Sequence, residues 1–369
     1  MNKFEYNNQM IFHPGYYIKD LIEELEMTQE EFAKRLNVTP KNLSDLLNGK
    51  ASISETIAKN LSLMLGTGVD VWLNLQMNYE QKLIEQRIHE AQQKEESSLK
   101  DIDFQYFVNL GLLQPQNEKR QKVLALFKYF SISSFDVMKQ PDFLVQFRLQ
   151  SKANELTILN SNILVQTIIN IGRNIKTEPF SLRKLKKHLS SIRKMQFESP
   201  ETFLPRLEKI LNECGVAFVL LPSYPKSGVY GAVKWLNKNK VILGMTDRGK
   251  YSDVFWFSFA HELAHVMQKR IKKTFIAYNE IEIIENFEEE ANNFARDFLI
   301  PSEKYEVFKT INSIEQNDIL EFAKLINAHP GIVVGRLQKD KIIEYNQYNK
   351  LKTRYQFSFD NYKNEKSVN

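Results

Sequence analysis

The sequence predicts a mainly α-helical protein with one small β-sheet, an α+β class in which helices dominate. Residues 15–80 contain short amphipathic segments separated by helix-capping residues. Residues 101–200 keep apolar residues every three or four positions, as helices do. Further on, the pattern changes to runs rich in Val, Ile and Leu, which are typical of strands. We therefore expect an all-α domain at 1–80, a helical connector at 81–159, and a domain that contains the sheet at 160–369.

The composition is that of a globular protein without a membrane segment. Hydrophobic residues make up 43% of the chain and charged residues 26%, which is ordinary for a soluble domain. No apolar run reaches the roughly 18 residues of a membrane helix, and the first residues lack the pattern of a signal peptide. The single cysteine, Cys214, excludes a disulfide framework and a cysteine-based zinc site. We expect a cytoplasmic protein.

Two short helices joined by a turn are expected within residues 28–48. Thr28 and Thr39 stand where helices begin, since a Thr hydroxyl can accept a hydrogen bond from the backbone of the first turn. Asn48 and Gly49 are typical of a left-handed helix end. Apolar residues of both segments have the spacing needed to pack the pair together. The segment therefore predicts a helix-turn-helix.

The second helix of the pair carries polar side chains of the kinds that contact DNA. Asn can bind adenine with two hydrogen bonds, while Lys, Ser and Thr reach guanine or phosphate. The candidate DNA contacts are Gln29, Thr39, Lys41, Asn42, Ser44 and Lys50. Residues 1–80 have a net charge of −4, so binding has to come from a local positive patch that includes Lys34 and Arg35. A helical module that binds protein instead of DNA is the alternative.

Residues 10–80 also resemble a known family. The sequence HPG, the helix pair, the sequence NGK and the stretch GTGVDVWLNLQ resemble the HigA-type antitoxin group of the Cro/C1 helix-turn-helix family. The resemblance implies that the domain binds operator DNA as a homodimer. It also implies that a toxin can be a partner, as in toxin-antitoxin pairs.

Residues 173–194 are strongly basic. They contain eight Lys and Arg residues against one acidic residue, Glu178, on a helical pattern. A solvated helix face is the first interpretation of such a run. A surface that contacts phosphates is the alternative.

Three strands and a long helix are expected in the C-terminal domain. Apolar runs at 216–222, 229–236 and 240–246 predict strands, with a hairpin turn between the last two. Ser252 and Asp253 are expected to cap the apolar helix that follows. Further helices are expected at 286–299, from Ser313, and after Pro330.

The long helix contains the motif HELAH. His261 and His265 are four residues apart, so both imidazoles project from one face and can bind one metal ion. Glu262 follows the first histidine and can act as a general base toward a water molecule that the metal activates. Two histidines in so apolar a helix would be costly to bury without a function.

A third ligand is expected on a neighbouring helix, in the segment FEEEANNFARDFLIP. Glu288 would complete a His₂Glu site. Asn292, four residues later, could hydrogen-bond to one of the metal-binding imidazoles without binding the metal itself. Glu290 is the alternative ligand. An acidic first helical turn would favour such residues without any metal, but it would not explain their pairing with HExxH.

Roughly residues 160–355 resemble the ImmA/IrrE family of zincin-like metallopeptidases. The resemblance rests on HELAH, on the following ExxAN-x-FA and LIP, and on HPGIVVGRLQ near the end. It implies that His261, His265 and Glu288 bind Zn²⁺ and that Glu262 is the catalytic base. Members of this family cleave helix-turn-helix repressors. Ala264 stands where the family commonly has glycine, and both residues are small.

The sequence thus predicts a dimeric transcription regulator fused to a zinc metallopeptidase domain. Zn²⁺ is the expected metal, and Mn²⁺ can replace it in a site with open positions. The expected partners are operator DNA, a second copy of the chain, and a toxin or a repressor substrate. The substrate is a separate repressor or the chain itself, cut between about residues 78 and 105. An antitoxin-like repressor whose metal domain senses a ligand without hydrolysis is the alternative.

Overall fold

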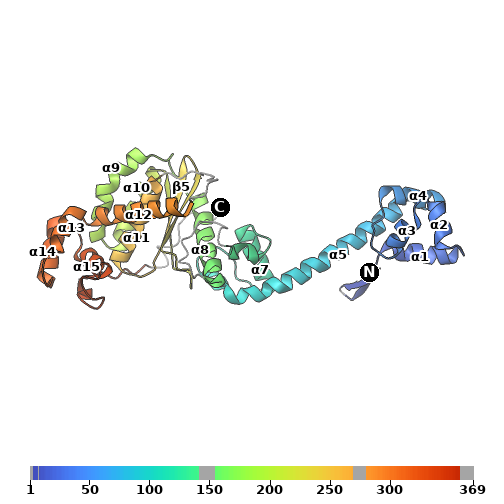
Figure 1. Cartoon of the computed structure of the whole chain (residues 1–369), viewed down its shortest axis with the longest axis horizontal. Helices are drawn as coiled ribbons and strands as arrows, with labels where there is room; N and C mark the ends of the chain where they lie inside the picture. The colour runs from blue at the N-terminus through green and yellow to red at the C-terminus, as the bar shows by residue number, and fades with distance from the viewer. Residues whose placement is uncertain (1–2, 7, 141–153, 269–279, 358–369) are drawn as a thin grey trace. The chain divides into compact units, whose positions relative to one another are not determined.

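A computed structural model describes residues 3–6, 8–140, 154–268 and 280–357. The chain divides into two compact units, Met1–Ser97 and Ser98–Asn369. Within the described ranges, no helix combines the length and the apolar character needed to cross a bilayer. The predominance of helices in Figure 1, with two small sheets, agrees with the mainly α class expected from the sequence.

The N-terminal unit is a helical bundle preceded by a β-hairpin. Its elements are β1 (Lys3–Tyr6), β2 (Gln9–Phe12), α1 (Pro14–Glu24), α2 (Gln29–Leu36), α3 (Pro40–Leu47), α4 (Glu55–Leu65) and α5 (Val69–Ser98). Its core contains the fully buried Ile18, Phe32 and Leu36, which have no exposed surface. The antiparallel β1–β2 hairpin was not expected from the sequence.

The helix starts around the turn follow the sequence prediction. The Thr28 hydroxyl accepts from the backbone N–H of Glu31 at 3.2 Å, and the Thr39 hydroxyl accepts from that of Asn42 at 3.1 Å. Gly49 has a φ of 63°, the left-handed conformation that ends a helix. These bonds confirm the helix-turn-helix formed by α2 and α3.

Two helix boundaries in this unit differ from the expectation. Ser52 followed by Glu55 has the spacing of a capping box and predicts a helix that opens at Ser52, but α4 begins at Glu55 and its cap is Ser54, which accepts from the N–H of Ile57. The Ser52 hydroxyl instead donates to Glu80 on α5 at 3.0 Å. The charged helical pattern predicts a helix over about 73–92, whereas α5 runs from Val69 to Ser98.

The C-terminal unit consists of helices around a three-stranded sheet. Its helices are α6 (Phe104–Asn109), α7 (Lys119–Phe130), α8 (Glu155–Asn174), α9 (Leu182–Lys194), α10 (Pro200–Glu213), α11 (Ser252–Met267), α12 (Glu280–Leu299), α13 (Ser302–Phe308), α14 (Gln316–Ile326) and α15 (Pro330–Lys339). Short 3₁₀ turns are η1 (Leu99–Asp101), η2 (Phe135–Lys139), η3 (Met195–Phe197) and η4 (Asn349–Leu351). The strands are β3 (Val216–Leu221), β4 (Gly231–Asn237) and β5 (Lys240–Thr246).

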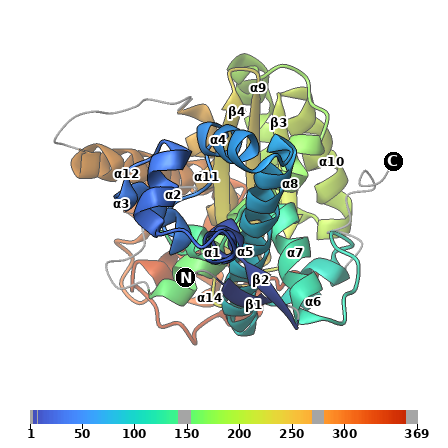
Figure 2. The ribbon, with the colours of Figure 1, turned by 90° about the vertical axis from the view of Figure 1, so that its right-hand side faces the viewer.

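The sheet has the order β3-β5-β4, so among the described residues β4 is an edge strand. Strands β3 and β5 are parallel, while β4 and β5 form the antiparallel hairpin expected from the sequence. The strands lie between α8 and α11 in both views of the ribbon (Figures 1 and 2). A Cβ at Gly244 would lie 2.4 Å from a carbon of Ile168, so glycine allows α8 to pack closely on β5.

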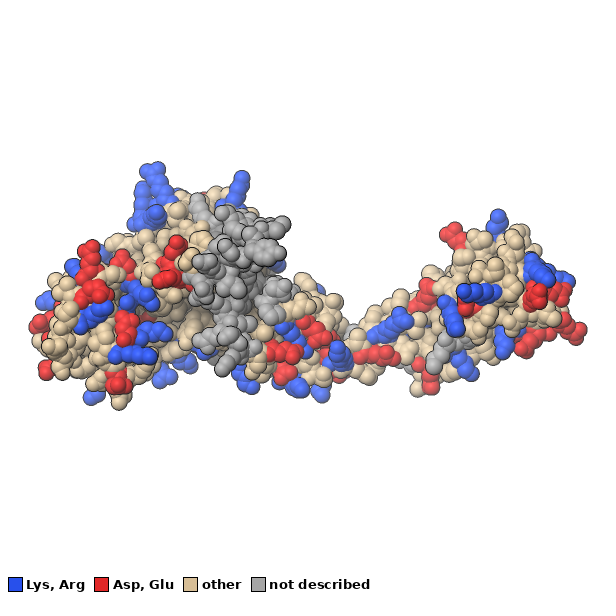
Figure 3. Space-filling model, in the orientation of Figure 1, with Lys and Arg blue, Asp and Glu red and all other residues tan. Residues whose placement is uncertain are grey.

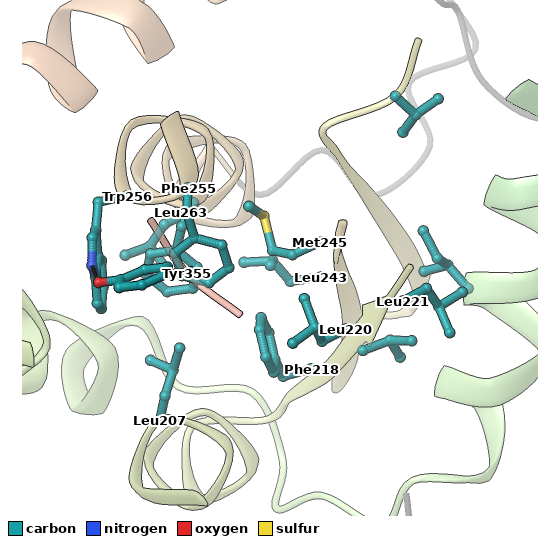
Figure 4. Packing of buried hydrophobic residues seen from close by; sticks show 14 of the residues in the cluster. Leu207, Phe218, Leu220, Leu221, Leu243, Met245, Phe255, Trp256, Leu263 and Tyr355 are labelled. Carbon is teal, nitrogen blue, oxygen red and sulfur yellow. Dashed lines mark hydrogen bonds between the residues drawn. The ribbon is translucent and has the colours of Figure 1, made fainter. Parts of the chain in front are cut away.

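The other face of the sheet packs against α11. Figure 4 shows Leu243 and Met245 of β5 pointing toward Phe255 and Leu263 of α11. All four side chains are at most 4% exposed. This packing fixes the rotation of α11 about its axis, and therefore fixes which of its residues face away from the core.

The start of α11 differs from the prediction. Ser252 and Asp253 were expected to be caps, but both lie in the first helical turn after Tyr251, which makes no side-chain cap bond. Asp253 instead forms a buried ion pair with Lys352 at 2.8 Å, and Ser252 N–H donates to the Thr353 carbonyl at 2.9 Å. A distant segment therefore satisfies the groups that the sequence assigned to local capping.

The later helices largely follow the prediction. Helix α12 starts at Glu280, before the expected residue 286, and ends two residues before Pro301 as expected. The helix expected from Ser313 begins at Gln316, because Glu315 and Asp318 form the capping box. The helix after Pro330 is confirmed as α15.

Both His-Pro-Gly sequences of the chain begin a helix in the same way. His13 Nδ1 accepts from the N–H of Gly15 at 3.0 Å at the start of α1. His329 Nδ1 accepts from the N–H of Gly331 at 3.1 Å at the start of α15. Burial lowers the pKa of each histidine, and only the neutral imidazole has a lone pair to accept these bonds.

Candidate metal centre

Helices α11 and α12 bring together three side chains with metal-ligating atoms. Glu288 Oε2 lies 3.4 Å from His261 Nε2, and Glu288 Oε1 lies 3.4 Å from His265 Nε2. The two Nε2 atoms are 3.1 Å apart. All three ligating atoms lie within 4.8 Å of one another. This is the spacing that one tetrahedral metal ion with two His ligands and one Glu ligand requires.

The sequence of α11 explains why the histidines face this point. Trp256 and Phe259 on the opposite side of the helix are fully buried. The side chains of His261 and His265 are 18% and 20% exposed, so the apolar side of α11 turns both imidazoles outward from the core. The side chain of Glu288 on α12 is 27% exposed.

The far nitrogen of each imidazole is held by an amide. His261 Nδ1 lies 3.0 Å from Asn292 Oδ1, and His265 Nδ1 lies 2.9 Å from Gln268 Oε1. Because an amide oxygen only accepts, each Nδ1 carries the proton and each Nε2 keeps its lone pair. The Gln268 amide nitrogen donates to the Phe287 carbonyl at 3.0 Å, which fixes the orientation of that amide.

These contacts test whether the residues suit a cation. Two Nε2 lone pairs 3.1 Å apart would repel each other unless a positive charge lay between them. The close approach of His261 and His265 keeps the pKa of Glu288 well below its usual range, so its carboxylate is ionised at neutral pH. Burial alone would lower the pKa of His265, but the nearby carboxylates of Glu288 and Glu262 outweigh burial and raise that pKa, so the surroundings favour a positive charge at this point. The donor set therefore suits a divalent cation.

Glu262 lies beside this group and faces β4. A Cβ at Gly231, the first residue of β4, would lie 2.5 Å from Glu262 Cγ and 3.1 Å from its Oε1. Only glycine therefore allows the edge strand to approach the carboxylate this closely. Burial raises the pKa of Glu262 more than the neighbouring His261 and His265 lower it, and the Glu288 carboxylate raises it further.

The structure separates the two candidate third ligands. Glu288 points between the imidazoles, whereas Glu290 is exposed and its carboxylate lies 3.4 Å from Gln268 Nε2. Sequence reasoning missed Gln268 and Gly231. A signal for Gln268 was present, since it stands three residues after His265 on the same helix face.

The candidate DNA contacts all lie in the N-terminal unit. Most are exposed, and only Ser44 is half-buried; the exposed ones are Gln29, Thr39, Lys41, Asn42 and Lys50. The positive patch expected around α2 is weaker than the sequence suggested. Lys34 pairs with Glu30 at 3.1 Å and Arg35 with Glu31 at 2.7 Å, so neighbouring acids offset both charges.

Comparison with known families matches both units. Residues 18–72 match the helix-turn-helix family model, and residues 250–338 match the model of the IrrE N-terminal-like domain. These matches confirm the two resemblances found in the sequence. The first match includes α2 and α3, and the second includes His261, Glu262, His265 and Glu288.

Three relatives are similar to part of this chain. The uncharacterized HTH-type transcriptional regulator YddM of Escherichia coli strain K12 is 38% identical over 63 residues, which are 17% of this chain and 67% of that protein. Virulence-associated protein A′ of Dichelobacter nodosus is 39% identical over 69 residues, which are 18% of this chain and 60% of that protein. A solved addiction module antidote protein of a HigA family from Coxiella burnetii is 30% identical, with a TM-score of 0.22, over 23% of this chain and 94% of that one.

Proposed function

We propose that this chain, which belongs to the helix-turn-helix regulators through its N-terminal unit and carries an IrrE N-terminal-like domain, is a DNA-binding transcription regulator with a metal-dependent peptidase centre. The observation that carries the proposal is the convergence of His261, His265 and Glu288 with Glu262 beside them. Motif spacing alone supports two ligands, whereas the packing of α11 on α12 supports a third.

The donor set favours zinc. Two imidazoles and one carboxylate are a common protein ligand set of catalytic zinc, which keeps further positions open. Manganese also accepts nitrogen and oxygen donors, so we expect it to support activity in vitro. When bound, the metal supplies Lewis-acid chemistry, polarising a peptide carbonyl and acidifying water. Asn292 and Gln268 hold the two imidazoles in the tautomer that this role needs.

Glu262 is the proposed general base. Its carboxylate accepts a proton from the attacking water as the water oxygen bonds to the peptide carbonyl carbon. The same proton then passes to the peptide nitrogen, and the carbon–nitrogen bond breaks to give a carboxylic acid and an amine. The burial that raises the pKa of Glu262 makes its carboxylate a stronger base than an exposed glutamate.

Strand β4 is the proposed site for the substrate backbone. It is the edge strand of the sheet among the described residues, and its first residue, Gly231, adjoins Glu262. An extended peptide can pair with such an edge through main-chain hydrogen bonds. The preferred substrate is then an extended or locally unfolded segment of a polypeptide.

The N-terminal unit is the proposed operator-binding part. Helix α3 presents Lys41 and Asn42 at its exposed start, where a recognition helix contacts base edges. Such proteins bind as dimers, and α5 offers a surface for a second copy. Met77, Ile84 and Ile88 are 59%, 54% and 51% exposed at spacings of seven and four residues, which place them on one face of α5.

The candidate protein partners and substrates of the chain are proposed next. A HigA-family relative is an addiction module antidote, so a toxin is one candidate partner, and a separate repressor or this chain is the candidate substrate. Residues 81–98 belong to the continuous helix α5, so cleavage of this chain between 78 and 105 requires local opening of that helix or attack near its end. We expect the protein to act in the cytoplasm, where operator DNA is found.

The proposal is tested by mapping cleavage products. Zinc-loaded full-length protein is incubated with operator DNA and cell extract, and new peptide termini are identified by mass spectrometry. The same fragments are expected from the wild type and from Glu290→Gln, which changes an exposed carboxylate on the same helix as Glu288. Every fragment should be lost in Glu262→Gln. Absence of any fragment, together with operator affinity that changes with metal, would assign the domain to sensing instead.

A further inference from the structure

The C-terminal unit carries a basic surface that the metal centre does not use. It is formed by exposed Lys and Arg side chains of α9, of the last turn of α8, of the loop between these two helices and of the β4–β5 turn. We call these residues the α9 surface: Arg173, Lys176, Arg183, Lys184, Lys186, Lys187, Lys194 and Lys238. Figure 3 shows blue side chains gathered over α9 in the view of Figure 1. Within the described part of the chain, none of the eight forms an ion pair.

One residue of the basic run, Arg193, is half-buried and is engaged within the protein instead. Arg193 Nε donates to the Phe298 carbonyl at 2.7 Å, and Arg193 Nη2 donates to the Leu299 carbonyl at 2.9 Å. Burial lowers the pKa of this guanidinium. The rest of the run is free for a ligand, because α9 buries only its apolar face, with Leu185 and Ile192 fully buried.

The segments of the α9 surface are held in fixed positions. Phe180 N–H donates to the Asn239 carbonyl at 2.8 Å, and its ring packs on Trp235 with 4.7 Å between centroids. Lys240 Nζ donates to the Arg173 carbonyl at 2.8 Å, joining the strand hairpin to the end of α8. These contacts therefore hold the charged segments in defined positions before any ligand binds.

A groove lies between the end of α8, the loop that follows it and the β4–β5 turn. It has a volume of about 600 Å³ and is lined by Arg173, Lys176, Lys238 and Lys240, with Glu178 as its one acidic residue. The lining is therefore predominantly positive, which favours an anionic ligand.

The charge of the chain is divided unequally between the two units. Residues 1–97 contain ten Lys and Arg and fifteen Asp and Glu residues, a net charge of −5. Residues 98–369 contain forty and thirty, a net charge of +10. A polyanion such as DNA is therefore repelled on average by the N-terminal unit and attracted by the C-terminal unit.

The chemistry of α9 favours duplex DNA among polyanions. Lipid surfaces take up helices with an exposed apolar face, but the apolar face of α9 is buried in the protein. Single-stranded nucleic acids need aromatic rings for base stacking, and α9 has none besides the His188 imidazole. From Arg183 to Lys194 the helix rises about 16 Å, along which one DNA strand carries about five phosphates.

We propose that the α9 surface binds the sugar–phosphate backbone of duplex DNA independently of sequence. It supplies the electrostatic attraction that the acidic helix-turn-helix unit lacks, while α3 supplies sequence preference. The choice of duplex DNA as ligand rests on the operator binding proposed above. The inference that this surface binds a polyanion rests only on the charges of the C-terminal unit.

The test uses the full chain and a random-sequence duplex of about 30 base pairs, roughly three helical turns. The variant Lys184→Gln/Lys186→Gln/Lys187→Gln removes three charges of the α9 surface. Its matched control, Lys304→Gln/Lys324→Gln/Lys339→Gln, removes three exposed charges elsewhere in the same unit. Dissociation constants are measured by fluorescence anisotropy over a range of salt concentrations, and unfolding curves check that both variants are folded.

The α9 variant should reduce the slope of log affinity against log salt by about 2.7, or about 0.9 for each phosphate that the protein no longer neutralises. Its affinity at about 0.1 M salt should fall by roughly two to three orders of magnitude, while the control variant stays close to wild type. Equal slopes for the two variants would overturn the inference. So would unchanged DNA binding with loss of binding to vesicles of phosphatidylcholine and phosphatidylserine, which would assign the surface to anionic lipid.

A recognition-helix variant separates this inference from the proposed operator binding. Lys41→Ala/Asn42→Ala should lose any sequence preference for operator DNA but keep salt-dependent binding to the random duplex. If that variant loses random-duplex binding as completely as the α9 variant should, the attraction resides in the N-terminal unit and the inference fails. If no operator preference exists but the α9 variant still weakens binding, the operator proposal fails and the inference stands.

Discussion

Arg193 ties together the ends of two helices in the C-terminal unit. Its guanidinium donates to the carbonyls of Phe298 and Leu299 at the end of α12, and to those of Ile326 and Asn327 at the end of α14, over distances of 2.7 to 3.0 Å. The last carbonyls of a helix have no partner within the helix. One side chain therefore satisfies carbonyls of both helices, and α12 is the helix that carries Glu288.

The expected cost of removing this side chain follows from these four bonds. A net hydrogen bond contributes about 0.5–1.5 kcal/mol to stability, so four contribute about 2–6 kcal/mol. The Asn327 bond is exposed and the other three are part-buried, so water can replace part of the loss. We expect Arg193→Ala to lower the free energy of unfolding by about 3 kcal/mol.

Urea unfolding followed by tryptophan fluorescence measures this effect, since Trp235 and Trp256 lie in the C-terminal unit. The midpoint should move to lower urea with an unchanged slope. Lys194→Ala, the exposed neighbour, is the matched control and should stay within about 0.5 kcal/mol of wild type. A loss below about 1 kcal/mol for Arg193→Ala, or an equal loss in the control, would refute the role assigned to the guanidinium.

Three further perturbations follow from the described contacts. Thr39→Ala should cost about 1 kcal/mol in urea unfolding because α3 loses its N-cap, whereas Thr39→Ser should keep it. His13 and His329 have a lowered folded pKa, so their contribution to stability is complete above about pH 6.5 and is lost as pH falls toward the folded pKa. His329→Asn should flatten the thermal stability profile between about pH 7 and 5, and a profile identical to wild type would exclude this cap as a source. Gly231→Ala should keep zinc but slow peptide hydrolysis by about a hundredfold, because the new Cβ displaces Glu262; unchanged hydrolysis would mean that the position of this carboxylate does not matter.

Features that lie within a single helix could be predicted from the spacing of residues in the sequence. The four-residue spacing of His261 and His265 places both on one face of any helix, and Thr28 and Thr39 cap their helices through bonds that span three residues. These are local effects, and local effects are visible in sequence.

Features set by distant segments were not predictable in this way. Ser252 and Asp253 look like caps in sequence, but Lys352 and Thr353 engage them from about a hundred residues away. The closeness of Gly231 to Glu262 depends on how β4 packs against α11, and the preference for Glu288 over Glu290 depends on the rotation of α12. Tertiary packing determines each of these contacts, and that packing could not be inferred from one sequence alone.

The metal content of four purified proteins tests the central claim most directly. The wild type should bind about one zinc ion per chain. His265→Ala and Glu288→Ala should lose it, because two remaining ligands hold zinc weakly, and Glu262→Gln should retain it, because Glu262 serves as a base and not as a ligand. Zinc lost from Glu262→Gln but retained by Glu288→Ala would contradict the account.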